Sequence, residues 1–209
     1  MIMSVEDYDD DYTAWEVKQH AKYSKKRIGS IVPAVTFKTR SREKLEWYDQ
    51  TSYDLFGNKR VIIFSLPGAF TPICSVKQLP AFEEKYDEFK AKGIDEVYCF
   101  AVNDSFVMNA WFNRYNIWKV KPIADGNARF TQGMHMLVQK ENLGFGERSW
   151  RYAAIINNGV IEAWFEEPGY RIIAISWFEE PGYSNNSEED PYGETSPENI
   201  MNWIDSQNQ

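Results

Sequence analysis

Residues 66–74, LPGAFTPIC, join a buried apolar run to a segment with helical spacing. The run that leads into them, Val61–Leu66, is apolar except for one serine, as expected of a strand inside a parallel sheet. From Ser75 onward, apolar residues recur every three or four positions, which indicates an amphipathic helix. Cys74 therefore falls where a buried strand ends and a helix begins.

The position of Cys74 predicts a reactive thiol. The first turn of a helix has unpaired backbone N–H groups and a partial positive charge, and both favour an anion. A cysteine placed there loses its proton more easily, and the thiolate is the nucleophilic form. We therefore expect cysteine chemistry at this position.

The segments after this loop alternate between helical and strand patterns. An amphipathic helix is expected over residues 75–92, and Pro80 must either kink it or start its regular part, because proline lacks a backbone donor. A second buried strand, Glu96–Val102, carries Cys99, and an Asn-Asp-Ser cap at 103–105 starts the next helix. This order implies parallel strands joined by right-handed crossovers.

The remaining elements complete an α/β fold with a central mixed sheet flanked by helices. The strongest single signal is Asn157-Asn158-Gly159, because such residues tolerate the positive φ angles of a tight hairpin turn. The other predicted elements are a short strand at 31–37, a helical turn at 52–56, hairpin strands at 151–156 and 160–165, and a C-terminal helix that starts at Ser196-Pro197.

A seven-residue segment, WFEEPGY, occurs twice, at 164–170 and again at 177–183. The offset of 13 residues (177 − 164) and the single repetition indicate a local duplication around 164–183 rather than a solenoid, which needs several units. The two copies compete for one strand position, and the copy that loses should form a loop or an extra edge strand. The sequence leaves open which copy that is.

Composition indicates a globular protein with one domain-sized core. The chain has 209 residues, 43% of them hydrophobic, and a net charge of −8. This negative charge disfavours nucleic acid as a partner, since nucleic-acid binders need a basic patch. No run of about 20 apolar residues is present, so no membrane span is expected.

The first 28 residues form an extension that changes from acidic to basic and lacks sustained periodicity. We expect a flexible, solvated tail over 1–28, with a partner-docking arm as the alternative. Its acidic start has the wrong charge for a secretory signal or a transit peptide. Together with a total of two cysteines, this predicts a cytoplasmic protein whose thiols are kept reduced.

The spacing Pro67-x-x-x-Thr71-x-x-Cys74 resembles the active-site loop of peroxiredoxins. The likeness continues in three further segments, 102–111, 125–127 and 143–152. It extends over residues 29–205, and the chain looks most like the atypical, type II members, in particular the form that is sometimes fused to a glutaredoxin domain. The resemblance implies a thioredoxin-like domain over 29–209, peroxide reduction without a metal or haem cofactor, and often a homodimer.

The same resemblance implies roles for four residues. Cys74 would attack one peroxide oxygen, expel water or an alcohol, and become a sulfenic acid. Thr71 lies three residues upstream on the same turn, where its hydroxyl could bond to the sulfur and to the peroxide. Arg151, at the family's arginine position, would stabilise the thiolate and hold both reactants, and Pro67 would shield the thiolate and shape the loop. The alternatives are an inert core cysteine, an ordinary turn threonine and a surface arginine.

Cys99 has two interpretations. It lies 25 residues after Cys74 (99 − 74), a separation like that of the two redox cysteines in plant-type members, where the second thiol closes a disulfide. It also lies inside a predicted central strand, where cysteine often serves only as a small apolar residue. A disulfide would need the helix start to unravel, because its Cα atoms must come within about 7 Å of each other. We favour packing, and therefore a one-cysteine mechanism restored by glutathione or a glutaredoxin.

The chain departs from the family pattern at Gln78, where these relatives usually carry a histidine. No glutaredoxin domain follows in this chain, so we expect the reductant to be glutathione with a separate glutaredoxin, or a thioredoxin. The alternative function is a redox sensor or interaction protein of the same fold with little turnover. A disulfide reductase is disfavoured because the chain has no Cys-x-x-Cys, and His20 and His135 lack ligand partners nearby in sequence, so no metal is expected.

Overall fold

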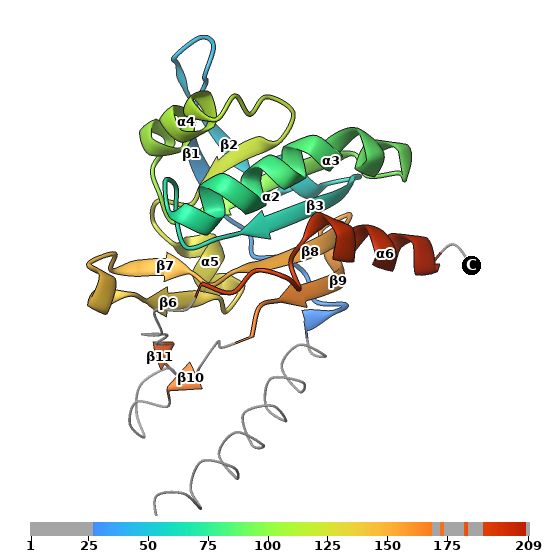
Figure 1. The fold of residues 1–209 in the computed structure, drawn as a ribbon. Coiled ribbons are helices and arrows are strands. Elements are labelled where there is room, and N and C mark those ends of the chain that lie inside the picture. The colour runs from blue at the N-terminus through green and yellow to red at the C-terminus, as the bar shows by residue number, and fades with distance from the viewer. Residues whose placement is uncertain (1–26, 169–171, 174–181, 184–189, 208–209) are drawn as a thin grey trace, which may run out of the picture.

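A five-stranded mixed sheet forms the centre of the computed structural model, which describes residues 27–168, 172–173, 182–183 and 190–207 (Figure 1). The strands are β3 (Arg60–Ser65), β4 (Glu96–Ala101), β5 (Lys121–Ala124), β8 (Tyr152–Asn157) and β9 (Val160–Glu166), in the order β5-β4-β3-β8-β9. The first three pair in parallel, whereas β8 pairs antiparallel with both β3 and β9. The predicted mixed sheet is confirmed.

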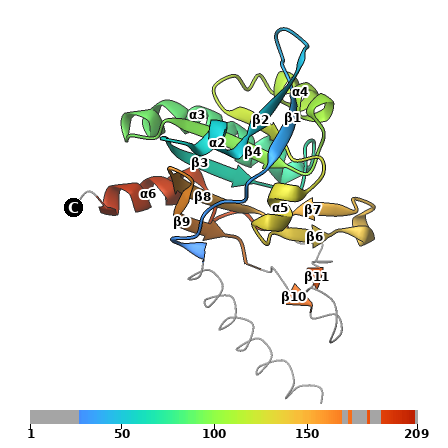
Figure 2. The same ribbon diagram turned by 180° about the vertical axis from the view of Figure 1, so that it is seen from behind.

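Helices cover both faces of this sheet (Figures 1 and 2). They are α2 (Ser52–Phe56), α3 (Leu79–Ala91), α4 (Ser105–Arg114), α5 (Arg129–Gly133) and α6 (Pro197–Gln207). Successive side chains of β3 point to opposite faces, so Ile62 and Phe64 pack with the apolar faces of α3, α4 and α6. Val61 and Ile63 pack with α2 and α5 on the other side. Because both faces are buried, the strand has the continuous apolar sequence that predicted it.

The helix after the loop begins with a turn of π-helix. Residues Cys74–Gln78 form η1, and regular α3 follows from Leu79 with Pro80 in its first turn. Pro80 has no backbone N–H, and inside an α-helix its ring would clash with the carbonyl four residues earlier. The wider turn avoids this clash, and the Leu79 N–H reaches the carbonyl of Cys74. Of the two predicted roles of Pro80, the structure shows the start of the regular helix.

The predicted hairpin closes one edge of the sheet. Asn158 and Gly159 both have positive φ angles, 48° and 79°, as the turn between β8 and β9 requires. The first copy of WFEEPGY supplies the last residues of β9, so it occupies the strand position for which the two copies compete. Of the second copy, the described residues include Gly182–Tyr183, which form β11 and pair with β10 (Ile172–Ile173).

The predicted strand at 31–37 is wrong in its limits. Ile31 makes an isolated bridge to Val160, and the strand β1 runs over Thr36–Arg40. Pro33 accounts for the later start, because it has no N–H to donate to a strand ladder.

Most of the predicted N-terminal extension, residues 1–26, lies outside the described residues. Arg27 follows these residues and is held by the first copy of the repeated segment. Its Nη1 lies 2.8 Å from Glu166 Oε2, and its guanidinium stands over the Trp164 ring, 4.4 Å from the centroid. These contacts attach the start of the described chain to β9.

Several short elements were not predicted. They are β2 (Trp47–Thr51), which pairs with β1, the strands β6 (Leu137–Gln139) and β7 (Glu147–Ser149), the 3₁₀ turn η2 (Glu141–Leu143), and β5 and α5 of the main layers. The side chains of β2 are exposed or half-buried, so this strand lacks the apolar alternation from which strands are recognised.

Candidate active site

The loop between β3 and η1 is held from the neighbouring strand. Asn103 follows β4, and its Oδ1 accepts a hydrogen bond of 3.0 Å from the Ala69 N–H. Because β3 and β4 run parallel, their carboxyl ends lie at the same edge of the sheet, which is where open α/β sheets bind ligands. Phe70 turns the chain with a φ of 65°, in the left-handed region that residues other than glycine rarely adopt.

Cys74 lies at the first position of η1 and is fully buried. The turn before it closes with a hydrogen bond of 3.0 Å from the Ser75 N–H to the carbonyl of Thr71. Ser75 Oγ in turn accepts from Trp111 Nε1 of α4 at 3.0 Å, which ties the helix start to the core. Cys74 therefore lies where the sequence placed it, between a buried strand and a helix.

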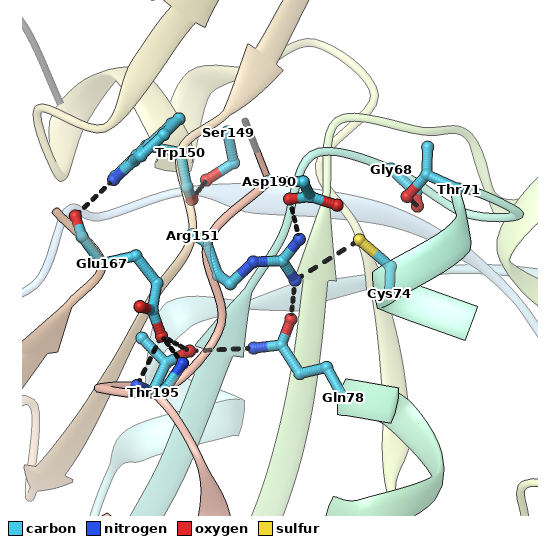
Figure 3. Close-up of polar contacts among 11 residues, drawn as sticks. Gly68, Thr71, Cys74, Gln78, Ser149, Trp150, Arg151, Glu167, Asp190 and Thr195 are labelled. Atoms are coloured by element: carbon cyan, nitrogen blue, oxygen red, sulfur yellow. Dashed lines mark hydrogen bonds and ion pairs between the residues drawn. The ribbon is translucent and has the colours of Figure 1, made fainter. Parts of the chain in front are cut away.

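Arg151 reaches Cys74 across 77 residues of sequence. It immediately precedes β8, whose first residue, Tyr152, pairs with Ser65 at the end of β3. That antiparallel register places Arg151 beside the loop that carries the cysteine. Arg151 is 1% exposed, and its Nη1 lies 3.5 Å from Cys74 Sγ (Figure 3). A fixed guanidinium at this distance favours the thiolate over the thiol.

The guanidinium has further partners within the described residues. Nη1 also donates to Gln78 Oε1, and Nη2 donates to the carboxylate of Asp190, whereas Nε has no partner among the described residues. The Tyr192 ring lies near it, with its centroid 5.9 Å from Cζ. Burial alone would lower the pKa of Arg151, but the negative charges of Cys74 and Asp190 and their hydrogen bonds raise it. Arg151 therefore stays charged.

A buried carboxylate, Glu167, fixes the segment that leads into α6. Its Oε1 accepts three hydrogen bonds of 2.8 Å, from the Gly193 N–H and from the N–H and hydroxyl of Thr195. Thr195 Oγ1 also lies 3.5 Å from Gln78 Nε2, so the network continues to the partner of the guanidinium (Figure 3). Trp150 adds a hydrogen bond of 2.9 Å from its Nε1 to the carbonyl of Glu167.

Thr71 and Pro67 lie in the same loop as the cysteine, but the Thr71 hydroxyl does not bond to the sulfur. It donates to the carbonyl of Gly68 at 2.9 Å, and the side chain is half-buried. That carbonyl lies three residues back in the same tight turn, so it is within easy reach of the hydroxyl. The hydroxyl oxygen keeps lone pairs with which it can accept a hydrogen bond from a substrate. Pro67 is buried.

Cys99 lies in β4, opposite Phe64 of β3 and Pro122 of β5. It is fully buried in the same core cluster as Cys74, and both cysteines are free thiols. Burial raises the pKa of Cys99 well above its usual value, and the negative charge of Cys74 adds to this, while Arg151 acts in the opposite direction. Cys99 is therefore held as a neutral thiol in a strand with neighbours on both sides.

Several residues of this network were not identified from the sequence. They are Asn103, Glu167, Asp190 and Thr195, and Gln78 was noted only as a departure from a pattern. The spacing of Gln78 could have identified it. A residue four positions after Cys74 lies on the same face of a helix, so its side chain is expected near the sulfur. The other four come from segments that only the fold brings together.

The described site supplies a buried thiol, a guanidinium and hydrogen-bonding groups. Within the described ranges, no group of three or more His, Cys, Asp or Glu side chains is arranged to hold a metal ion. No helix in this part of the chain combines the length and the apolar character that a membrane crossing requires.

The chain is similar to known proteins in sequence and in structure. The Redoxin family model matches residues 28–179. A peroxiredoxin of Rhizobium etli is 54% identical over 180 residues, which are 83% of this chain and 93% of that protein. A hybrid peroxiredoxin of Haemophilus influenzae is 53% identical over 140 residues, which are 67% of this chain and 57% of that protein.

A solved structure extends the comparison to three dimensions. The antioxidant protein of Plasmodium falciparum, a 1-Cys peroxiredoxin, matches with a TM-score of 0.75 and 33% identity over 85% of this chain and 99% of its own. This match and the family model confirm the thioredoxin-like fold. The chain belongs to the peroxiredoxin family, and its activity is that of a thiol peroxidase.

Proposed function

We propose that the protein reduces hydrogen peroxide and alkyl hydroperoxides through Cys74 and is restored by glutathione with a separate glutaredoxin. The observation that carries the proposal is the contact of 3.5 Å between Arg151 Nη1 and Cys74 Sγ at the start of a helix. It combines a fixed cation with a helix N-terminus, and both favour the nucleophilic thiolate.

In the first half-reaction, the Cys74 thiolate attacks one oxygen of the hydroperoxide. An S–O bond forms while the O–O bond breaks, and the leaving hydroxide or alkoxide takes up a proton. The cysteine is oxidised to a sulfenic acid, and the hydroperoxide is reduced to water or an alcohol. Arg151 and the Thr71 hydroxyl bind the hydroperoxide and stabilise the charge on the leaving oxygen, and Pro67 shields the sulfur from water.

In the second half-reaction, the thiolate of glutathione attacks the sulfenic sulfur. An S–S bond forms while the S–O bond breaks, the leaving hydroxide takes up a proton to give water, and a mixed disulfide remains on Cys74. A second thiol, from glutaredoxin or another glutathione, attacks this disulfide and releases the reduced cysteine. The resemblance to the hybrid form of the family supports this choice of reductant, and no metal or organic cofactor takes part in the proposed cycle.

Cys99 takes no part in this cycle. It is a buried, neutral thiol in a strand that is paired on both sides, so neither access nor charge suits it to attack a sulfenic acid. The similarity to a 1-Cys peroxiredoxin supports the same conclusion. We also propose that the protein forms a homodimer, because the family resemblance implies one. Its acidic start and its total of two cysteines support a cytoplasmic location.

Turnover tests the proposal directly. The purified protein is mixed with hydrogen peroxide and either glutathione with glutaredoxin or thioredoxin with its reductase. We expect catalytic peroxide consumption with the first pair, lost in Cys74→Ser and retained in Cys99→Ser. Activity with the thioredoxin mixture only would show that thioredoxin, and not glutathione with glutaredoxin, is the reductant. Stoichiometric oxidation without turnover in either mixture would favour a redox sensor.

The mass of the intact protein after one equivalent of peroxide tests the one-cysteine mechanism. A gain of one oxygen, or of one glutathione when that thiol is present, is expected. A loss of two hydrogen atoms would indicate a disulfide between Cys74 and Cys99 and would contradict the mechanism.

A further inference from the structure

The two terminal nitrogens of Arg151 have different partners. Nη1 faces Cys74 Sγ and Gln78 Oε1, whereas Nη2 donates to the carboxylate of Asp190 (Figure 3). A hydroperoxide held beside the sulfur needs a donor from the same guanidinium. Asp190 occupies one of these donors, Nη2, and its negative charge offsets part of the positive charge that acts on the sulfur.

The two members of this ion pair differ in burial. The Arg151 side chain is 1% exposed, while that of Asp190 is 32% exposed. Gln78 Oε1 and the surrounding core hold the guanidinium independently of the carboxylate. Loss of the carboxylate would therefore leave Arg151 in place, whereas the Asp190 side chain is partly exposed to water.

Other ionisable groups surround the pair. Lys140 precedes η2, is almost fully buried and interacts electrostatically with both Asp190 and Arg151. Burial lowers the pKa of Lys140, and the Asp190 charge partly opposes this. Burial raises the pKa of Tyr192 to about 12, so this residue is neutral in the physiological range. Among the described residues, Asp190 is the carboxylate that pairs directly with the guanidinium.

We propose that Asp190 is a positioning residue that restrains Cys74. In the resting protein it neutralises part of the Arg151 charge and occupies Nη2, and the hydroperoxide displaces it on binding. This inference rests on the proposed function, because it takes Cys74 as the reacting thiol. It predicts that removal of the carboxylate makes the Cys74 thiol more reactive. If Asp190 only held Arg151 in place, its removal would make the thiol less reactive.

The test compares Asp190→Asn and Asp190→Ala with a matched control, Asp87→Asn. Asp87 in α3 pairs with Lys119 at 2.6 Å, is exposed, and lies 13 residues beyond Cys74 (87 − 74), about 20 Å along the helix. The control removes the same unit of charge away from the site. Two rates are measured. The first is the rate at which iodoacetamide alkylates Cys74 at pH 6 and pH 8, monitored by the mass of the intact protein. The second is the second-order rate of the reaction with hydrogen peroxide.

Both Asp190 variants should be alkylated about fivefold faster than the wild type at both pH values, because the guanidinium then acts on the sulfur with more of its charge. Their reaction with peroxide should accelerate as well, while the control variant behaves like the wild type. Asp190→Glu, which keeps the charge, should return both rates toward the wild-type values. Rates in Asp190→Asn and Asp190→Ala that are unchanged or lower would overturn the inference.

The two proposals fail in different ways. If the wild type did not turn over peroxide but the Asp190 variants were still alkylated faster, the peroxidase cycle would be wrong and the restraint would stand. If the wild type turned over peroxide but the Asp190 variants were alkylated no faster, the peroxidase cycle would stand and the restraint by Asp190 would be wrong.

Discussion

Glu167 accepts hydrogen bonds from both the backbone N–H and the hydroxyl of Thr195, each at 2.8 Å. Both residues are buried, and the adjacent Glu166 pairs with Arg27 at 2.8 Å. Two successive glutamates in the first copy of the repeated segment therefore hold opposite ends of the described chain. The copy that occupies β9 is thus a structural junction between the sheet, the N-terminal segment and the approach to α6.

Glu167→Gln should destabilise the fold, because a neutral amide oxygen accepts the three hydrogen bonds from Gly193 and Thr195 more weakly than the charged carboxylate does. We expect a loss of about 1.5–3 kcal/mol in the free energy of unfolding, the range for buried hydrogen bonds to a charged group. Urea denaturation measures it. Glu162→Gln is the matched control, since Glu162 pairs with Arg60 on the half-exposed face of β9 and should cost about 1 kcal/mol or less. Equal losses in the two variants would contradict the role given to Glu167.

Arg151→Lys should keep the charge but lose the planar fork that reaches the sulfur, Gln78 and Asp190 together. We expect the second-order rate with hydrogen peroxide to fall by about 10²-fold, as for the loss of one donor to a developing charge. Stopped-flow fluorescence provides the rate, and circular dichroism checks that the variant is folded. A rate within twofold of the wild type would show that a point charge suffices.

Thr71→Val tests the hydroxyl that donates to the carbonyl of Gly68. Valine keeps the shape of the side chain and removes the oxygen that we expect to bind the hydroperoxide. The peroxide rate should fall by about 10²-fold, whereas alkylation of Cys74 changes little, because no substrate oxygen is involved in alkylation. Thr71→Ser, which keeps the hydroxyl, should stay close to the wild type. If alkylation fell as much as the peroxide rate, the hydroxyl would act on the thiol and not on the substrate.

The raised pKa of Cys99 makes stability depend on pH in the alkaline range. The folded protein binds this proton more tightly than the unfolded chain, so the contribution is fully present below about pH 8.5, the usual thiol pKa, and is lost as the pH rises above it. Between pH 8.5 and 10 the wild type should lose up to about 1.4 kcal/mol per pH unit from this one group. Cys99→Ala should show a shallower decline in urea denaturation across the same range. Parallel curves for the two proteins would mean that Cys99 ionises in the fold as it does in the unfolded chain.

Much of the fold follows from local sequence. Val61–Leu66, Asn157-Asn158-Gly159 and Ser196-Pro197 each carry a signal that depends only on neighbouring residues: apolar continuity, tolerance of positive φ, and helix capping. Short strands with exposed side chains, such as β2, lack such a signal. They have no buried apolar face, so their sequence does not alternate between apolar and polar residues. The limits of the predicted strand at 31–37 failed for a local reason as well, since Pro33 cannot join a ladder.

The sequence alone determined that Cys74 stands at the junction of a buried strand and a helix, because that junction is built from adjacent residues. The tertiary structure decided which groups meet the sulfur. Arg151 arrives through the register of β8 on β3, and Asp190 arrives through the segment that Glu167 holds in front of α6. Pairing between distant segments depends on the packing of the whole domain, which no local pattern encodes, and so the partners of Arg151 are visible only in the folded chain.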